Sequence, residues 1–331
     1  MYIKRKIKGI LKKILPHFIV LKHEKNKILK QKYPTSDEPK IYNESGELFR
    51  TLFLSSSVTK QWPYGFVLGR YPRNIFWDNF NYGLNNHFYA HEKIFSQIGK
   101  PLKKFAIFVE SESIVPYEYT FFDSNSSVSK DFNLIFTHSE KLLNKFGNAV
   151  FIPGGGVWYG TEKHGGAINI NQCNLKTKNV SIVSSDKSMC KLHDFRKELA
   201  IHYKKNNLVG TYGTFDNGKY AQLDEYLTDY RYSIVIENNV SSYWFTEKLL
   251  NCFASMTVPI YIGAKKITDF FNQDGIIQVN DISIEAIDKI IRNCNENDYF
   301  SRLNAIIDNF NRVKDFLCIE DYIFKKYGNL F

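Results

Sequence analysis

Short apolar runs and helical patterns alternate along most of the chain. In the first half, strands are predicted within 51–57, 74–80, 105–109, the start of 132–147 and 148–156, whereas 87–99 is predicted as a helix that ends at Gly99. In the second half, strands are predicted within 179–186, 207–213, 232–237, 258–263 and 275–281, with helices at 192–205 and from Thr246 onward, and a helical tail from Ile284. Strands that alternate with helices predict layered α/β sheets.

Chain length and a change in composition predict two domains. The chain has 331 residues, more than one typical domain, and a polar segment rich in glycine and asparagine at 160–178 is the expected connection. The predicted parts are a basic arm at 1–32, an N-terminal domain at 48–160, a C-terminal domain at 175–305 and closing helices at 306–331. The predicted fold class is therefore α/β, with two Rossmann-like domains facing a central cleft.

The arm carries a large share of the formal net charge of +10. Its lysines lie between isoleucines and leucines at helical spacing, which predicts a basic amphipathic helix suited to an anionic membrane surface. A solvated helix, or one docked on a partner, is the alternative. The apolar stretch is too short and too charged to span a bilayer, and it lacks the features of a signal peptide. Because the basic excess is terminal and no nucleic-acid-binding motif is present, we expect no nucleic-acid partner.

The cysteines and histidines indicate neither a disulfide framework nor a metal site. Five scattered cysteines form no Cys-x-x-Cys pair, and the eight histidines form no His-Glu-x-x-His. His87 and His91 could share a helix face, but no third ligand stands near them. This cysteine usage is typical of a cytoplasmic protein.

Polar side chains gather where one predicted strand ends and the next helix begins. Glu237, Asn238 and Asn239 follow a buried strand, and in a parallel sheet ligands bind at this end of the strands. Thr246 is a plausible N-cap, and a helix start with Lys248 in its first turn favours phosphate. Glu237 and Glu247 are candidate acceptors for sugar hydroxyls. The pattern predicts a site for an anionic, hydroxyl-rich ligand such as a nucleotide sugar.

The stretch YSIVIENNVSSYWFTEKLLNCFASMTVPIYIG, residues 232–263, resembles the donor-site signature of the family 10 α1,3/4-fucosyltransferases. The matching residues are Glu237, Asn238, Thr246, Glu247, Lys248, Val258, Pro259 and Gly263, whereas Asn239 replaces a serine. The resemblance implies a GT-B fold, GDP-fucose as donor, inversion at the anomeric carbon and no required metal or other cofactor. It also implies that Lys248 contacts the diphosphate, and that Glu237, Asn238 and Glu247 contact ribose or fucose.

The same resemblance implies a catalytic base and exposes one departure. The family's base is a glutamate at the end of a strand in the N-terminal domain, which points to Glu110, with Glu112 as the alternative. The family usually has an arginine where this chain has Leu192. Lys191 and Arg196 are the candidates to replace it.

The sequence therefore predicts an inverting, metal-independent α1,3-fucosyltransferase. It would transfer fucose from GDP-fucose to a glycan or lipid-linked glycan of a bacterial surface polysaccharide or lipopolysaccharide O-antigen. The arm would hold it peripherally on the inner face of the cytoplasmic membrane. A GT-B transferase that uses another GDP- or UDP-sugar is the alternative, motivated by Leu192. A nucleic-acid-binding protein is the weaker third hypothesis.

Overall fold

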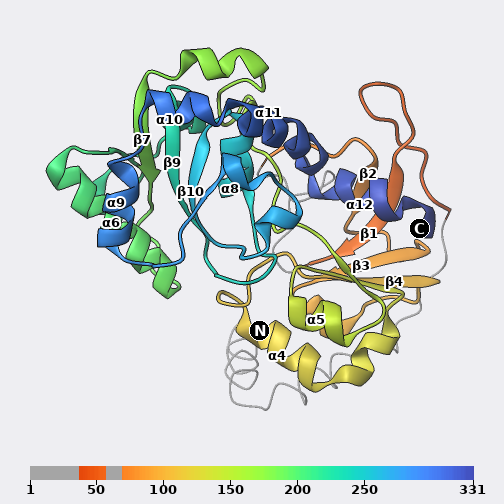
Figure 1. The fold of residues 1–331 in the computed structure, drawn as a ribbon. Helices are drawn as coiled ribbons and strands as arrows, with labels where there is room; N and C mark the ends of the chain where they lie inside the picture. The colour runs from red at the N-terminus through yellow and green to blue at the C-terminus, as the bar shows by residue number, and fades with distance from the viewer. Residues whose placement is uncertain (1–36, 57–68) are drawn as a thin grey trace.

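The computed structural model describes residues 37–56 and 69–331. The predicted amphipathic helix at 1–32 lies outside these residues. Two α/β units, each built on a parallel sheet, make up the described chain, with α8 (Glu247–Ala254) between them (Figure 1). The predicted α/β fold class with two such domains is thereby confirmed.

The first domain is built on a six-stranded sheet. Its strands run in the order β2 (Ile75–Asp78), β1 (Arg50–Ser55), β3 (Asn86–Ala90), β4 (Lys103–Ile107), β5 (Leu134–Thr137) and β6 (Ala149–Phe151), all parallel. The helices α3 (Lys93–Ser96), α4 (Pro116–Ser124) and α5 (Glu140–Lys145) connect them. Because helices cover a parallel sheet on both faces, the central strands are buried at most positions rather than at alternate ones.

The predicted helix at 87–99 is wrong over its first half. Residues 86–90 form the central strand β3, and only residues 93–96 are α-helical. All five positions of β3 are buried between β1 and β4. A short apolar run that is buried on both faces has no alternating pattern, so periodicity alone cannot separate it from a helix. His87 consequently lies inside the sheet, where burial lowers its pKa to about 4, and it shares no helix face with His91.

The second domain is built on a five-stranded sheet. Its strands run in the order β11 (Ile277–Gln278), β10 (Val258–Ile262), β9 (Tyr230–Ile236), β7 (Lys178–Val183) and β8 (Gly210–Tyr212), all parallel. The helices that cover it are α6 (Lys191–Asn206), α7 (Leu223–Leu227), α8, α9 (Ile284–Ile291), α10 (Glu296–Ser301) and α11 (Leu303–Arg312). The short helices α4 and α7 were not predicted.

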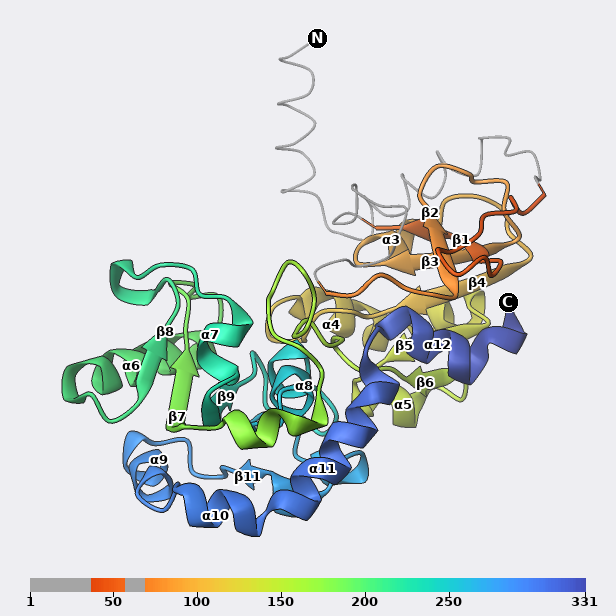
Figure 2. The same cartoon turned by 90° about the horizontal axis from the view of Figure 1, so that it is seen from above.

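The chain crosses between the domains a second time at its C-terminal end. Figure 2 shows α11 leading from the second sheet toward α12 (Ile319–Tyr327), which lies beside the first sheet. Ile319, Ile323 and Phe331 belong to the same apolar core as strands β1 to β4. The Asp321 carboxylate accepts hydrogen bonds from the backbone N–H of Arg73 and Asn74, at 2.9 and 3.1 Å. The final helix is thus part of the first domain.

Candidate functional site

The second sheet has a topological switch point between β7 and β9. From β7 the chain moves outward to β8 and then returns to β9 on the other side of β7. In such sheets a crevice opens beyond the carboxyl ends of the two strands that flank the switch, and ligands bind there. The segments that follow these two strands are Ser184–Asp186 and Glu237–Asn239. The predicted polar triplet therefore lies at the switch point.

Glu237 is enclosed by its own protein. Its side chain is 0% exposed, and both of its oxygens are occupied. Oε1 accepts hydrogen bonds from the backbone N–H and the hydroxyl of Thr246, at 2.9 and 3.0 Å, while Oε2 lies 3.3 Å from Lys248 Nζ. The Glu237 carboxylate thus holds the start of α8 and the lysine, and its contact with sugar hydroxyls stays a prediction.

Lys248 is the cation at the edge of this cluster. Its side chain is 26% exposed, and Nζ lies 3.3 Å from Glu237 Oε2 and 3.4 Å from Glu247 Oε1. Burial lowers the pKa of Lys248, but the carboxylates of Glu247 and Glu237 outweigh this effect, so the net pKa lies above its ordinary value. Burial also raises the pKa of Glu237, and Lys248 opposes that shift. Lys248 is therefore a charged, partly accessible group held in a fixed position.

Thr246 caps α8, as predicted. Its backbone is extended and its hydroxyl accepts the N–H of Lys248 at 3.3 Å. The glycine turn 154–156 of the preceding segment lies against this helix start: a Cβ on Gly155 would come within 2.7 Å of the Glu247 backbone nitrogen. The predicted use of this helix start for phosphate therefore rests on Lys248 more than on free N–H groups.

Arg196 comes from α6 and reaches the same cluster. Its Nη1 donates to the backbone carbonyl of Ile236 at 2.7 Å, and its side chain is 8% exposed. Burial lowers its pKa, and Glu237 opposes this. Leu192, in the position where the family has arginine, lies four residues earlier on α6, so Arg196 stands one turn further along the same face. Lys191 is exposed at the start of the helix, which leaves Arg196 as the better-placed candidate.

His193 was not predicted as a site residue. It is buried on the same face of α6 as Arg196, and its Nε2 lies 2.8 Å from Asn238 Oδ1. Burial lowers the pKa of His193, so the ring is neutral at neutral pH. Its position three residues before Arg196 on one helix face was the available signal.

A pocket of about 210 Å³ lies between the two domains. The first domain contributes Glu112, Tyr119, His138 and Glu140, and the second contributes Asn239, Ser242 and Lys265. Lys266 Nζ and Glu140 Oε1 form an ion pair across the same boundary at 2.6 Å. Two α/β domains with a pocket between them constitute the predicted GT-B arrangement.

The two candidate bases lie in one loop but differ in their exposure to solvent and in their contacts. Glu112 is exposed and lines the interdomain pocket. Glu110 is partly buried, and its Oε1 accepts the backbone N–H of Ser111 at 2.8 Å. Ser113 of this loop donates from its hydroxyl to the Asn238 carbonyl at 2.8 Å. The loop is thereby joined to the polar triplet of the second domain.

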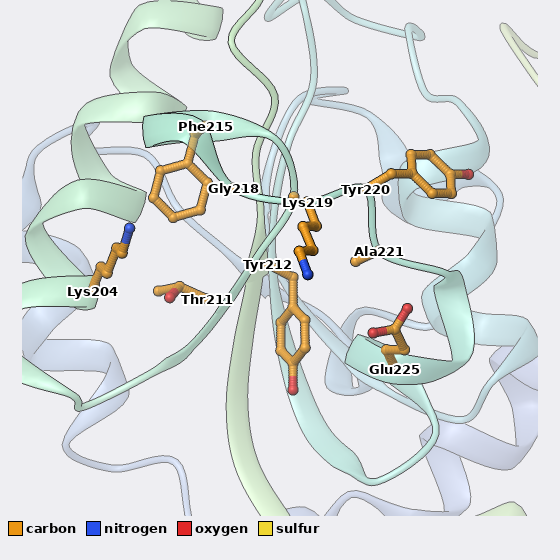
Figure 3. A pocket seen from close by; sticks show the side chains of 10 residues that line it. Lys204, Thr211, Tyr212, Phe215, Gly218, Lys219, Tyr220, Ala221 and Glu225 are labelled. Atoms are coloured by element: carbon orange, nitrogen blue, oxygen red, sulfur yellow. The ribbon is translucent and has the colours of Figure 1, made fainter.

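A second hollow, of about 240 Å³, lies at the carboxyl end of β8. Figure 3 shows Phe215 and Lys204 on one side, Glu225 on the other, and Tyr212 and Lys219 between them. Gly213 makes this turn possible because its φ is +107° and a Cβ there would lie 2.0 Å from the Ser184 carbonyl oxygen. This hollow was not predicted from the sequence, although Gly213 at a strand end, between the aromatic residues Tyr212 and Phe215, was a visible signal.

Comparison with known proteins finds a family resemblance for most of the second domain. Residues 173–302 match the model of glycosyltransferase family 10 (fucosyltransferase), C-terminal domain. The second domain is thus similar to the C-terminal domain of this family. An α-(1,3)-fucosyltransferase from Helicobacter pylori is 33% identical over 69 residues, a region that covers 20% of this chain and 14% of that protein. The chain thus aligns with a small part of that relative's length.

Solved structures resemble the chain at low sequence identity. A crystal structure of an α1,3-fucosyltransferase has a TM-score of 0.47 at 16% identity and covers 86% of either chain. An α1,3-fucosyltransferase with GDP-fucose has a TM-score of 0.45 at 13% identity and covers 87% of this chain and 92% of that one. Sucrose-phosphate synthase from Thermosynechococcus elongatus has a TM-score of 0.47 at 14% identity, with coverage of 75% and 72%.

The candidate residues divide between the family 10 domain and the rest of the chain. Lys191, His193, Arg196, Glu237, Asn238, Asn239, Thr246, Glu247 and Lys248 lie inside 173–302, whereas Glu110 and Glu112 lie outside it. Across 37–56 and 69–331, no group of three or more His, Cys, Asp or Glu side chains could hold a metal ion. Helices long and apolar enough to cross a membrane are also absent from those two ranges.

Proposed function

We propose that the protein is an inverting, metal-independent glycosyltransferase that moves fucose from GDP-fucose to a glycan acceptor, with α1,3 linkage. The observation that carries the proposal is the pair of cations at the switch point of the family 10 domain. Lys248 and Arg196 stand beside Glu237 and Glu247 there, which makes the four-residue cluster neutral overall. The Helicobacter pylori relative is an α-(1,3)-fucosyltransferase, which supports fucose as the transferred sugar and this linkage.

The cations would bind the donor diphosphate. Lys248 is held in place by Glu237 and remains 26% exposed, so it can contact a phosphate without a change of position. As the bond between the sugar and the diphosphate breaks, negative charge grows on the leaving phosphate, and preorganised cations stabilise it. The aromatic hollow at Tyr212 and Phe215 would receive the nucleoside, because it lies at the neighbouring strand end.

A carboxylate of the first domain would act as the base. The acceptor hydroxyl oxygen attacks the anomeric carbon, its proton passes to Glu110, and the nucleoside diphosphate leaves with the electron pair of the broken bond. Because the attack comes from the face opposite the leaving group, the anomeric configuration inverts. The interdomain pocket at Glu112 and Asn239 is the proposed place for the reacting sugars.

The acceptor and the location are proposed from the sequence pattern. A lipid-linked glycan of a bacterial surface polysaccharide or O-antigen fits a cytoplasmic protein whose basic arm at 1–32 binds anionic lipid at the inner face of the membrane. Transfer from another GDP- or UDP-sugar is the second candidate, favoured by Leu192 in place of the arginine.

Calorimetry with GDP and UDP, in EDTA and in magnesium, tests the donor. We expect GDP to bind equally in both buffers, and Lys248→Ala to weaken binding by about tenfold or more, since a charge-assisted contact contributes about 1.5–3 kcal/mol. Transfer from GDP-fucose to a panel of oligosaccharides then follows the reaction. Preference for UDP over GDP would refute GDP-fucose as the donor. Binding that requires magnesium would refute the proposed metal independence.

Two variants test the base. Glu110→Gln should lower turnover by about 10²–10⁴-fold while GDP affinity stays unchanged. Glu112→Gln is the matched variant from the same loop. A large loss in Glu112→Gln together with a small loss in Glu110→Gln would transfer the role to Glu112.

A further inference from the structure

Behind the loop that carries Glu110, two buried side chains form a line of hydrogen bonds. The hydroxyl oxygen (Oη) of Tyr119, a residue of α4, lies 2.5 Å from the backbone carbonyl oxygen of Glu110. The Nε2 atom of His138, which follows β5, lies 2.9 Å from the same hydroxyl oxygen. Both side chains are 3% exposed. The line runs from the end of β5 to the end of β4.

The chemistry of the groups fixes the direction of each bond. A carbonyl oxygen only accepts, so the single hydroxyl proton of Tyr119 must point at Glu110. The Tyr119 oxygen is then an acceptor toward His138, whose Nε2 must carry a proton and donate. Hence the imidazole is the Nε2–H tautomer. Burial lowers the pKa of His138 to about 3, so the ring is neutral throughout the physiological range. Burial also raises the pKa of Tyr119 well above its ordinary value, which keeps its proton in place.

The hydrogen bond to Tyr119 is the main polar contact of the His138 side chain among the described residues. Nδ1 of His138 is buried without a hydrogen-bond partner in the described part of the chain. The ring packs against Trp244 of the second domain, with centroids 4.2 Å apart. Tyr119 and His138 also line the interdomain pocket. The pair therefore joins the backbone of Glu110 to the boundary where the domains meet.

We propose that His138 and Tyr119 are positioning residues that fix the backbone of Glu110 and so restrict the orientation of its carboxylate. This inference rests on the proposed function, because it assumes that Glu110 is the base. The carbonyl that accepts from Tyr119 belongs to Glu110 itself. The hydrogen bond therefore limits rotation of the Glu110 main chain and, with it, the position of the Glu110 side chain. A displacement of about 1 Å at a reacting group is enough to cost about 10²-fold in rate.

Three variants test the line of bonds. Tyr119→Phe removes the hydroxyl and keeps the ring. His138→Leu removes the donor, whereas His138→Gln offers an amide N–H near the position of Nε2. Turnover and acceptor KM would be measured in the transfer assay, GDP affinity by calorimetry and Tm by thermal unfolding.

We expect Tyr119→Phe and His138→Leu to lower kcat by about tenfold or more, with GDP affinity within about twofold of wild type. His138→Gln should recover most of the loss. A normal kcat in Tyr119→Phe overturns the proposal. So does an equal loss of kcat in His138→Gln and His138→Leu, since that result would show packing alone to be the role of the ring.

The protonation of the ring gives a readout that needs no activity. Imidazole ¹⁵N chemical shifts of the full chain should show a neutral Nε2–H tautomer that does not titrate down to about pH 4, given a pKa of about 3. A neutral Nδ1–H tautomer, or a protonated ring at neutral pH, overturns the line of bonds. A wild type without any transfer activity would overturn the proposed function, and the shifts would still decide the tautomer.

Discussion

Ser113 of the first domain donates its hydroxyl proton to the backbone carbonyl of Asn238 in the second, over 2.8 Å. Ser113 follows β4 and Asn238 follows β9, so the bond joins the two sheets at their carboxyl ends. On one side the network continues to Ser111, whose Oγ lies 3.0 Å from that of Ser113. On the other it continues through Asn238 Oδ1 to His193. The loop with the proposed base and the loop with the proposed donor residues are thus in direct contact.

Ser113→Ala should loosen this contact. Loss of one interdomain hydrogen bond should lower the free energy of unfolding by about 1 kcal/mol, and turnover should fall because the two loops are no longer aligned. Denaturant unfolding and the transfer assay check the two effects. Ser127→Ala, on an exposed 3-10 turn, is the control and should change neither quantity.

Gly155→Ala should destabilise the protein. The added Cβ would lie 2.7 Å from the backbone nitrogen of Glu247, and a backbone atom cannot move aside as a side chain can. Overpacking of this kind costs about 1–3 kcal/mol in the free energy of unfolding, and GDP affinity should fall as the start of α8 shifts. Gly147→Ala is a matched control, since no atom lies within 4 Å of a Cβ built there. Equal stability of the two variants would contradict this packing of Gly155 against α8.

Arg196→Lys should weaken GDP binding even though the positive charge remains. A shorter ammonium cannot keep the bond to the Ile236 carbonyl and also face the ligand as a planar guanidinium does. We expect a loss of about tenfold, or about 1.4 kcal/mol, in calorimetry. Lys191→Ala at the exposed start of the same helix should leave the affinity unchanged. If Lys191→Ala caused the larger loss, the arginine's assigned place at the diphosphate would be refuted.

Lys176 should make stability depend on pH. Its ammonium is buried and donates to the Leu227 carbonyl at 2.7 Å and to the Thr257 hydroxyl at 2.9 Å. Burial lowers its pKa from 10.5 to about 7. Between these values the unfolded chain binds the proton and the folded chain does not, so the free energy of unfolding rises with pH across this window and the gain is lost as pH falls toward 7.

Denaturant unfolding of wild type and Lys176→Met across this window isolates the effect. As pH rises, the difference in stability between the two proteins should shift in favour of wild type by up to about 1.4 kcal/mol per pH unit. The Leu227 carbonyl also accepts from the Thr257 hydroxyl at 3.1 Å, and this bond should persist in the variant and limit the loss at the site itself. A difference that stays constant with pH would show that the lysine titrates normally.

The sequence predicted the sheets and the polar loops better than the roles of single residues. The end of a strand, as at Glu237, can be predicted from a run of apolar residues followed by a polar one, because that pattern is local in the sequence. Burial of the Glu237 carboxylate is not local, because it depends on Thr246 and Lys248 folding back across the loop. Burial of His87 is also not local, because its strand is buried on both faces and therefore lacks the alternating pattern that would separate it from a helix.

Contacts between distant segments could not be predicted from one sequence. Two examples are the hydrogen bond from Arg196 to the Ile236 carbonyl and the hydrogen bonds that Tyr119 makes to Glu110 and His138. Both depend on how helices pack on sheets. The four-residue spacing of Leu192 and Arg196 in α6 puts them on one helix face, and this relation was available from helix geometry although it was not predicted.

The crossing of α12 to the first sheet affects how the protein is made. Strands β1 to β4 are synthesised early, yet their core also contains Ile323 and Phe331, which the ribosome adds only after the second domain. The Phe331 ring lies against Phe88 and Phe105, with centroids 5.6 and 5.4 Å apart. The first domain therefore completes its core later than the second, and until then the apolar face of its sheet is exposed to chaperones and to neighbouring nascent chains.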